Sequence, residues 1–185
     1  FTGVSQSPER DVDLLRSTGS SYPDAISQRY TDLPADTPPR LETFSSQLTR
    51  DADNPYDTAM AIQDWLRTEK TYSLQASAQS EHIADTFVFE MEAGYCEYFA
   101  TAMTAMLRTQ DIPARYVVGY STGESVGENR FQVRAMNAHA WVEVYFQDFG
   151  WIKFDPTPGN SRLETQEAAL QRSNPGADYD VREPG

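Results

Sequence analysis

The sequence predicts an α+β domain in which helices come first and an antiparallel sheet follows. Between about residue 40 and residue 109, stretches of the chain have apolar residues every three or four positions, and after Pro113 apolar residues alternate with polar ones. Helical patterns followed by strand patterns, without strict alternation of the two, are typical of the α+β class. With 185 residues and 39% hydrophobic content, the chain is long enough for one ordinary domain with a core.

Composition divides the chain into three parts. Residues 1–39 are rich in Ser, Asp, Thr and Pro and lack sustained periodicity, so we expect a lead-in or stalk, partly packed at Tyr30 and Leu33. Residues 40–160 carry the periodic patterns and form the predicted folded domain. Residues 161–185 are a polar tail that is expected to be partly disordered, although 162–172 could be helical.

Two helices are expected in the first half of the folded domain. A short helix over 40–50 would bury Leu41, Phe44 and Leu48. Asn54-Pro55 supplies a capping side chain and then a proline, which together favour the start of a helix. Apolar side chains continue that helix to about Lys70 at Ala59, Ile62 and Leu66. Residues 71–74 are expected to be extended and 75–86 to form a polar loop.

A third helix is predicted from about Tyr95 to Thr109, and strands follow it. The helix has an apolar stripe formed by Phe99, Met103, Met106 and Leu107, and Asp111-Ile112-Pro113 ends it. Alternating patterns predict strands over 115–121, 131–135, 138–146 and 151–155. A turn marked by Gly123, Gly127 and Asn129 would join the first two strands. The third helix is expected to pack against the sheet.

The charge of the chain is strongly acidic, with 28 Asp and Glu against 15 Lys and Arg and a net charge of −13. Such a surface repels phosphate, so we expect no nucleic-acid partner. The only lysines are Lys70 and Lys153, a composition that favours a salt-adapted source, although an ordinary acidic domain would look the same. The chain has no run of ~18 apolar residues that could span a membrane. Because it starts at Phe1 without a signal peptide, we expect an excised piece.

Cys96 is the only cysteine, so the chain cannot form an internal disulfide. A lone thiol is either an inert core residue or a reactive group. Its position at the start of a predicted helix favours the second reading, because the unpaired N–H groups and the dipole there stabilise a thiolate. Gly94 is expected to let the backbone turn sharply and to keep the approach to the sulfur open.

His139 is the candidate proton-transfer partner of this thiol. The other histidine, His82, lies in polar surroundings and is expected to be a solvated loop residue. His139 lies on a strand with one apolar face, and it shares the mixed face with Trp141, Glu143 and Tyr145. Such a histidine could be structural on its own, but a cysteine at a helix start favours a catalytic role.

A catalytic histidine needs an acceptor that orients its ring. Glu143 is ~13 Å away along the same strand, so Asp155, which ends the next strand, is the candidate. Pairing Phe146 with Trp151 would place Asp155 opposite Val142, on the face of the sheet that His139 does not share. Pairing Phe146 with Gly150 places it diagonal to His139, so we predict an odd-length turn or a bulge between the strands.

Other contributors to the site are less well defined by the sequence. The backbone N–H of Cys96 is a natural donor to an oxyanion, and Tyr72 or Trp65 could supply a second one. Tyr95 and Trp141 are further candidates for oxyanion or substrate contacts. We expect no metal site and no cofactor, because no cluster has metal-ligand spacing and the acidic loop over 123–128 lacks an EF-hand pattern.

Eight short blocks occur in an order and spacing that resemble the transglutaminase-like superfamily of papain-fold thiol enzymes. The likeness is greatest to the extracytoplasmic domain of prokaryotic membrane-anchored transglutaminase-like proteins, and it covers roughly residues 30–160. The blocks are Leu33-Pro34 through Pro39, Asn54-Pro55-Tyr56, Thr71-Tyr72-Ser73-Leu74, Phe87-Val88-Phe89-Glu90, Gly94 to Ala100, Ala114 to Tyr120, His139-Ala140-Trp141 and Asp155-Pro156-Thr157.

The resemblance implies a papain-like core and a catalytic domain over residues 40–160. It implies that Cys96 is the nucleophile, His139 the general acid and base, and Asp155 the residue that orients the ring. The expected reaction is attack on a carboxamide, typically of glutamine, to give a thioester that a primary amine or water then takes. The expected partners are therefore a protein or peptide with a glutamine side chain and an amine acceptor.

The resemblance also implies a location and leaves alternatives open. Similar proteins are tethered by transmembrane segments outside this fragment, which implies the extracytoplasmic face of the membrane. The calcium sites of the animal branch have no counterpart in the sequence. A cysteine protease or amidase of the same fold remains an alternative, as does a non-catalytic domain that binds peptide or cell-wall partners. The complete set of Cys, His and Asp argues against the non-catalytic domain.

Overall fold

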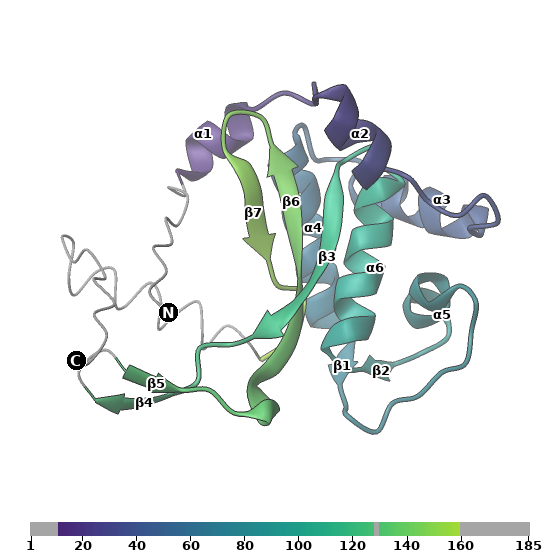
Figure 1. Cartoon of the computed structure of the whole chain (residues 1–185). Coiled ribbons are helices and arrows are strands. Elements are labelled where there is room, and N and C mark those ends of the chain that lie inside the picture. The colour runs from purple at the N-terminus through teal and green to yellow at the C-terminus, as the bar shows by residue number, and fades with distance from the viewer. Residues whose placement is uncertain (1–10, 128–129, 160–185) are drawn as a thin grey trace.

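The structure is a computed structural model that describes residues 11–127 and 130–159. Its helices precede its main sheet, as the sequence predicts, and helix α6 lies between that sheet and α5 (Figure 1). The helices are α1 (Val12–Ser17), α2 (Asp24–Tyr30), α3 (Pro39–Leu48), α4 (Pro55–Glu69), α5 (Ile83–Phe89) and α6 (Cys96–Arg108). The strands are β1 (Thr71–Tyr72), β2 (Ala93–Gly94), β3 (Ala114–Tyr120), β4 (Glu124–Gly127), β5 (Arg130–Gln132), β6 (Ala138–Phe146) and β7 (Gly150–Phe154).

The main sheet has the order β3-β6-β7 and is antiparallel throughout. Phe146 pairs with Gly150, so three residues form the turn between β6 and β7. Asp148 and Gly150 take positive φ angles of 69° and 75° in this turn, a conformation that glycine adopts without strain. The predicted register and odd-length turn are therefore confirmed.

Helix α6 supplies the centre of the hydrophobic core. The predicted stripe of Phe99, Met103, Met106 and Leu107 is fully buried. It meets the apolar face of β6, whose Ala140, Val142, Val144 and Phe146 are buried at alternate positions. Burying each large side chain contributes about 1.5–3 kcal/mol, so the contact between α6 and β6 fixes where the start of the helix lies relative to the sheet.

Helix α4 begins and packs as its sequence predicts. The side chain of Asn54 accepts a hydrogen bond from the backbone N–H of Asp57 at 2.9 Å, and Pro55 is the first helical residue. The predicted apolar side chains of this helix, Ala59, Ile62 and Leu66, are completely buried. In α3, Leu41 is buried in the same core. These two helices complete the helical layer around α6.

The N-terminal segment contains more structure than its composition predicts. Helices α1 and α2 have six and seven residues, which is too short for a periodic pattern to stand out. Asp11 caps α1, and Leu15 is buried in the central core. Tyr30 packs edge-on against Trp151 with ring centroids 4.7 Å apart, in line with the partial packing expected there. The proposed boundary at residue 39 stays a prediction.

The expectation of a loop up to residue 86 is wrong, because α5 begins at Ile83. Its polar residues hide the helix in the sequence, since Asp85 is buried and bonded to Arg40 of α3. Lys70 donates to the carbonyl oxygens of Val88 and Met91 at 2.8 and 2.6 Å and so satisfies acceptors near the end of α5.

The strand prediction around residue 131 is also partly wrong. β4 lies where a turn was expected, and it pairs with β5 in a separate two-stranded sheet. Strand β5 ends at Gln132, before the predicted end at residue 135, and Ala135–Asn137 forms a 3₁₀ turn before β6 begins. The predicted helix over 162–172 and the predicted disordered tail lie outside the described residues.

Gly94 has a different role from the one expected. It lies in the extended strand β2, which pairs with β1 in parallel, and so it forms no sharp turn. A Cβ atom at Gly94 would lie 2.6 Å from the ring of Phe87 and 2.9 Å from the Cβ of Tyr98. Glycine is required at this position because the core packs against the backbone immediately before Cys96.

Replacing Gly94 by alanine should therefore lower the free energy of unfolding by about 1–3 kcal/mol, because the added methyl group overpacks the core. Urea denaturation measures the change. Gly19→Ala is the matched control, since the nearest atom to its new Cβ would be 4.0 Å away. Equal stability of the two variants would contradict the packing role of Gly94.

Candidate active site

Three predicted site residues lie at one end of the layered structure. Cys96 is the first residue of α6, His139 is the second residue of β6, and Asp155 directly follows β7. The start of α6, the start of β6 and the end of β7 point to the same end of the molecule (Figure 1). The antiparallel pairing of β6 with β7 places the start of one strand beside the end of the other.

His139 and Asp155 form a buried contact. The Nε2 atom of His139 lies 2.7 Å from Oδ2 of Asp155. The side chains are only 9% and 7% exposed, so little water screens the interaction between them. The register that pairs Phe146 with Gly150 produces this contact, because it places Asp155 diagonal to His139.

The surroundings favour a charged His139 ring. Burial disfavours the charged form, but hydrogen bonds with Asp155 and Cys96, together with their charges, raise the pKa of His139 to about 9. A hydrogen bond with the thiol of Cys96 is thus one of the causes that raise this pKa. Burial disfavours the Asp155 carboxylate, yet the His139 contact and the N–H of Thr157 lower the pKa of Asp155 below its ordinary value.

Helix α4 holds the backbone of Asp155 from both sides. Gln63 accepts a hydrogen bond from the N–H of Asp155 at 2.9 Å, and Nε of Arg67 donates to its carbonyl oxygen at 2.8 Å. Gln63 and Arg67 are one helical turn apart, so they share a face of α4. Thr157 donates its N–H to Oδ1 of Asp155 at 3.1 Å and fixes the carboxylate itself.

Neither α4 residue was identified from the sequence. In the sequence Gln63 is an ordinary polar residue of an amphipathic helix, and only the structure shows that it is 4% exposed. Trp65, a predicted oxyanion donor, lies two residues after Gln63 and so faces another direction from the helix. Its ring packs edge-on against Phe44 at 4.9 Å, in the contact region of α3 with α4.

Trp141 lies beside the histidine on the mixed face of β6. Its ring is nearly parallel to that of His139, with an interplanar angle of 27° and centroids 6.3 Å apart. The indole N–H points to Glu143 at 3.5 Å, and the ammonium of Lys153 lies 4.8 Å from the ring centroid. A Cβ at Gly119 would lie 2.6 Å from this indole, so the glycine opposite His139 makes room for it.

Three tyrosines interact electrostatically with Cys96. Burial raises the pKa of Tyr72, Tyr95 and Tyr116, and the charge of Cys96 contributes to each shift. Tyr72 is brought there by the parallel pairing of β1 with β2, in which it lies opposite Gly94. Tyr95 is the N-cap residue of α6. Tyr116 was missed, because in the sequence it is one of several alternating residues of β3.

His82, expected in a solvated loop, precedes α5 as its N-cap residue, and its side chain lies 3.7 Å from Asp36. Within residues 11–127 and 130–159, no three His, Cys, Asp or Glu side chains gather so that they could hold a metal ion. In the same residues, no helix combines the length and hydrophobicity needed to cross a membrane.

Sequence comparison connects the chain with known proteins. A family model described as the transglutaminase-like superfamily matches residues 42–156. The chain is 38% identical over 171 residues to the uncharacterized protein YebA of Bacillus subtilis, covering 86% of this chain and 23% of YebA. It is 32% identical over 149 residues to a protein-glutamine gamma-glutamyltransferase of Pseudomonas aeruginosa, covering 75% of this chain and 22% of that protein. The chain thus spans less than a quarter of either relative.

Solved structures give a consistent result. The periplasmic domain of TgpA from Pseudomonas aeruginosa, bound to ethylmercury, matches with a TM-score of 0.68 and 32% identity. That match covers 78% of this chain and 54% of the solved chain. A candidate cysteine protease from Cytophaga hutchinsonii matches with a TM-score of 0.51 and 25% identity, over 80% of this chain and 43% of that chain.

The His139 contact predicts a specific dependence of stability on pH. A pKa raised from 6.5 to about 9 means that the ring stabilises the fold fully below pH 6.5. This contribution is lost as the pH rises through about 9, and the free energy of unfolding should fall by roughly 3 kcal/mol across that window. Urea denaturation at a series of pH values measures the slope.

Asp155→Asn provides the control for this pH dependence, because it removes the charge that holds the proton on His139. The variant should lose most of the slope between pH 6.5 and about 9. A wild-type free energy of unfolding that stays constant over this window would contradict a raised pKa of His139.

Replacing Gln63 by leucine should lower the free energy of unfolding by about 1–3 kcal/mol, because the buried N–H of Asp155 loses its acceptor. It should also lower the pKa of His139 in an NMR titration, since a displaced Asp155 holds the proton less well. Gln47→Leu is the matched control on the exposed face of α3. A loss of stability without any change in the pKa of His139 would show that Gln63 does not position the carboxylate.

Proposed function

This chain belongs to the transglutaminase-like superfamily, and we propose that it catalyses thiol-dependent acyl transfer on carboxamides of proteins or peptides. In this proposal Cys96 is the nucleophile, His139 the general acid and base, and Asp155 the residue that orients the ring. The observation that carries it is the buried contact between His139 and Asp155 at 2.7 Å, with Cys96 in hydrogen-bonding reach of the same ring.

The first half of the proposed reaction forms a thioester. The sulfur of Cys96 attacks the carbonyl carbon of a glutamine carboxamide, and the carbonyl oxygen becomes an oxyanion. His139 then donates a proton to the leaving nitrogen, the C–N bond breaks and ammonia departs. Because Nε2 of His139 contacts Asp155, the other ring nitrogen is available to exchange protons at the sulfur and the leaving group.

The second half transfers the acyl group. A primary amine attacks the thioester carbon, His139 removes a proton from the amine, and the C–S bond breaks to regenerate Cys96. Attack by water in place of the amine gives glutamate. The same residues serve both outcomes, so the acceptor is decided by access to the thioester.

The start of α6 suits stabilisation of the oxyanion. The backbone N–H of Cys96 belongs to the first helical turn, whose donors have no partner within the helix. We propose the hydroxyl of Tyr72 as the second donor, supported by its pairing opposite Gly94 and the influence of Cys96 on its pKa, after that of burial. Trp141 would then shield the His139 ring and contact the substrate.

The relatives support proposals about the whole protein. One is a protein-glutamine gamma-glutamyltransferase, which favours protein-bound glutamine as acyl donor and a primary amine as acceptor. The likeness to a periplasmic domain favours a location on the extracytoplasmic face of the membrane, in a parent protein tethered outside this fragment. Residues 40–160 would form the catalytic domain. The salt-adapted surface stays a prediction, so assays belong at about 0.1 M and about 2 M salt.

A cysteine protease is the second candidate function, because a candidate cysteine protease shares 25% identity and a TM-score of 0.51 with the chain. It would use the same thiol and the same histidine on a peptide bond in place of a side-chain carboxamide. The two functions differ in the product, since proteolysis shortens the peptide and acyl transfer does not.

The test combines labelling with turnover. Alkylation of Cys96 by iodoacetamide near pH 6, followed by mass, should be slowed about 100-fold or more in His139→Ala, and little in His82→Ala. A glutamine peptide and a fluorescent primary amine should give a labelled peptide of unchanged length, and Cys96→Ala should give none. Shortened peptide would instead support the protease. Alkylation at the rate of an ordinary thiol in the wild type would overturn both enzymatic functions.

A further inference from the structure

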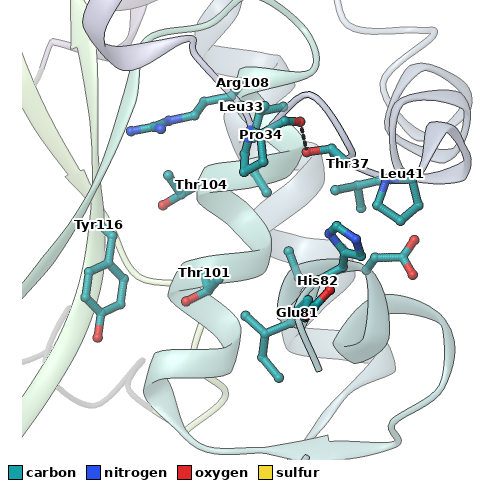
Figure 2. A pocket seen from close by; sticks show the side chains of 15 residues that line it. Leu33, Pro34, Thr37, Leu41, Glu81, His82, Thr101, Thr104, Arg108 and Tyr116 are labelled. Carbon is teal, nitrogen blue, oxygen red and sulfur yellow. Dashed lines mark hydrogen bonds between the residues drawn. The ribbon is translucent and has the colours of Figure 1, made fainter. Parts of the chain in front are cut away.

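A pocket of about 270 Å³ lies along the outer face of α6, away from the side where Asp155 is held. Figure 2 shows Tyr116 of β3 on one side of it and Glu81 and His82 on the other, with Thr101, Thr104 and Arg108 of α6 between them. The segment before α3 closes the pocket with Leu33 and Pro34. Neither the fold nor the proposed reaction requires an open space at this position.

Several polar groups of the pocket already have partners within the protein. Thr104 donates to the carbonyl oxygen of Ala100 at 2.8 Å, and Thr37 donates to that of Pro34 at 2.7 Å. Arg108 donates to two backbone carbonyl oxygens, at 3.0 and 2.8 Å. Asp85 is bonded to Arg40. The remaining walls are mostly apolar, so an occupant gains little from charge and most from apolar contact.

The pocket shares α6 with Cys96, although Cys96 itself does not line it. Thr101 lies five residues after Cys96 on α6 and Thr104 lies eight after it, which corresponds to ~7.5 and ~12 Å along the helix axis. Tyr116 belongs to both places, since it lines the pocket and lies close enough to Cys96 to feel its charge. Successive helical residues are rotated by ~100°, so Thr104 lies ~80° and Thr101 ~140° around the axis from Cys96, and a chain bound at Cys96 would cross the surface of α6 on the side of Tyr116 to reach the pocket.

We propose that this pocket binds one large apolar side chain of the peptide substrate, two to four residues from the reactive glutamine. The inference rests on the proposed function, since it takes Cys96 as the point of attack. An extended peptide advances ~3.3 Å per residue, so ~7.5–12 Å corresponds to about two to four residues. The volume is below the ~300–1,000 Å³ of most small-molecule sites, which suits a single side chain.

The proposal is tested with peptides that contain one glutamine among alanine and serine residues. One leucine is placed one, three or six residues from the glutamine, on either side, and kcat/KM for amine incorporation is measured. Leucine at the third position on one side should raise kcat/KM about tenfold over alanine, because its burial is worth more than 1.4 kcal/mol. Leucine at the first and sixth positions should have little effect.

Thr101→Trp fills the pocket and should reduce this leucine preference to about one. Thr68→Trp, an exposed threonine of α4 changed in the same way, should keep the preference and is the matched control. Ala105→Leu, deeper along α6, is a second filling variant for the case that Thr101→Trp does not fold. A preference that survives both filling variants would overturn the assignment of the pocket.

A binding measurement separates this inference from the proposed function. With Cys96→Ala, which cannot react, the peptide with leucine at the favoured spacing should bind about tenfold more tightly than its alanine version, and Thr101→Trp should remove the difference. Turnover without any leucine preference would overturn the pocket and leave acyl transfer intact. Preferential binding without turnover by the wild type would overturn acyl transfer and leave the pocket intact. Equal binding of both peptides would overturn the pocket.

Discussion

The buried contact between His139 and Asp155 is the interaction on which the arrangement of the site depends. Two charged groups inside a protein are stable only when they are paired and their remaining hydrogen-bonding groups are satisfied. Here the carboxylate meets the ring at 2.7 Å and also accepts the N–H of Thr157. Gln63 and Arg67 of α4 form hydrogen bonds with the backbone of Asp155. The pair is therefore fixed by the helical layer as well as by the sheet.

A single feature of the hairpin decides whether that contact forms. The turn between β6 and β7 has three residues, and a change of one residue would rotate the side chain of Asp155 to the other face of the strand. The turn uses positive φ angles at Asp148 and Gly150, so its sequence and its geometry agree. The contact of α6 with β6 then sets the distance between Cys96 and His139. The site is thus the joint result of one turn and one packed helix.

The parts of the structure that the sequence predicts are those with local causes. The start of α4 follows from the cap at Asn54-Pro55, and the extent of α6 follows from its apolar periodicity. The register of the last hairpin follows from the two-residue repeat of a strand. The missed parts have distant causes. Helix α5 depends on the pairing of Asp85 with Arg40, 45 residues away in the sequence. The hydrogen bond of Gln63 with Asp155 spans 92 residues, and no local pattern could reveal it.

Different parts of the chain form the candidate site on one side of α6 and the pocket on the other. Proton transfer is proposed to depend on α4, β6 and β7, which position His139 and Asp155. The pocket is built from the segment before α3, the residues around His82 and the outer face of α6. Helix α6 contributes to both, and Tyr116 lines the pocket while its pKa responds to the charge of Cys96, after burial and Glu97. If the pocket binds peptide as proposed, substitutions in residues 33–41 or 81–85 would change peptide preference and leave the buried contact of His139 with Asp155 intact.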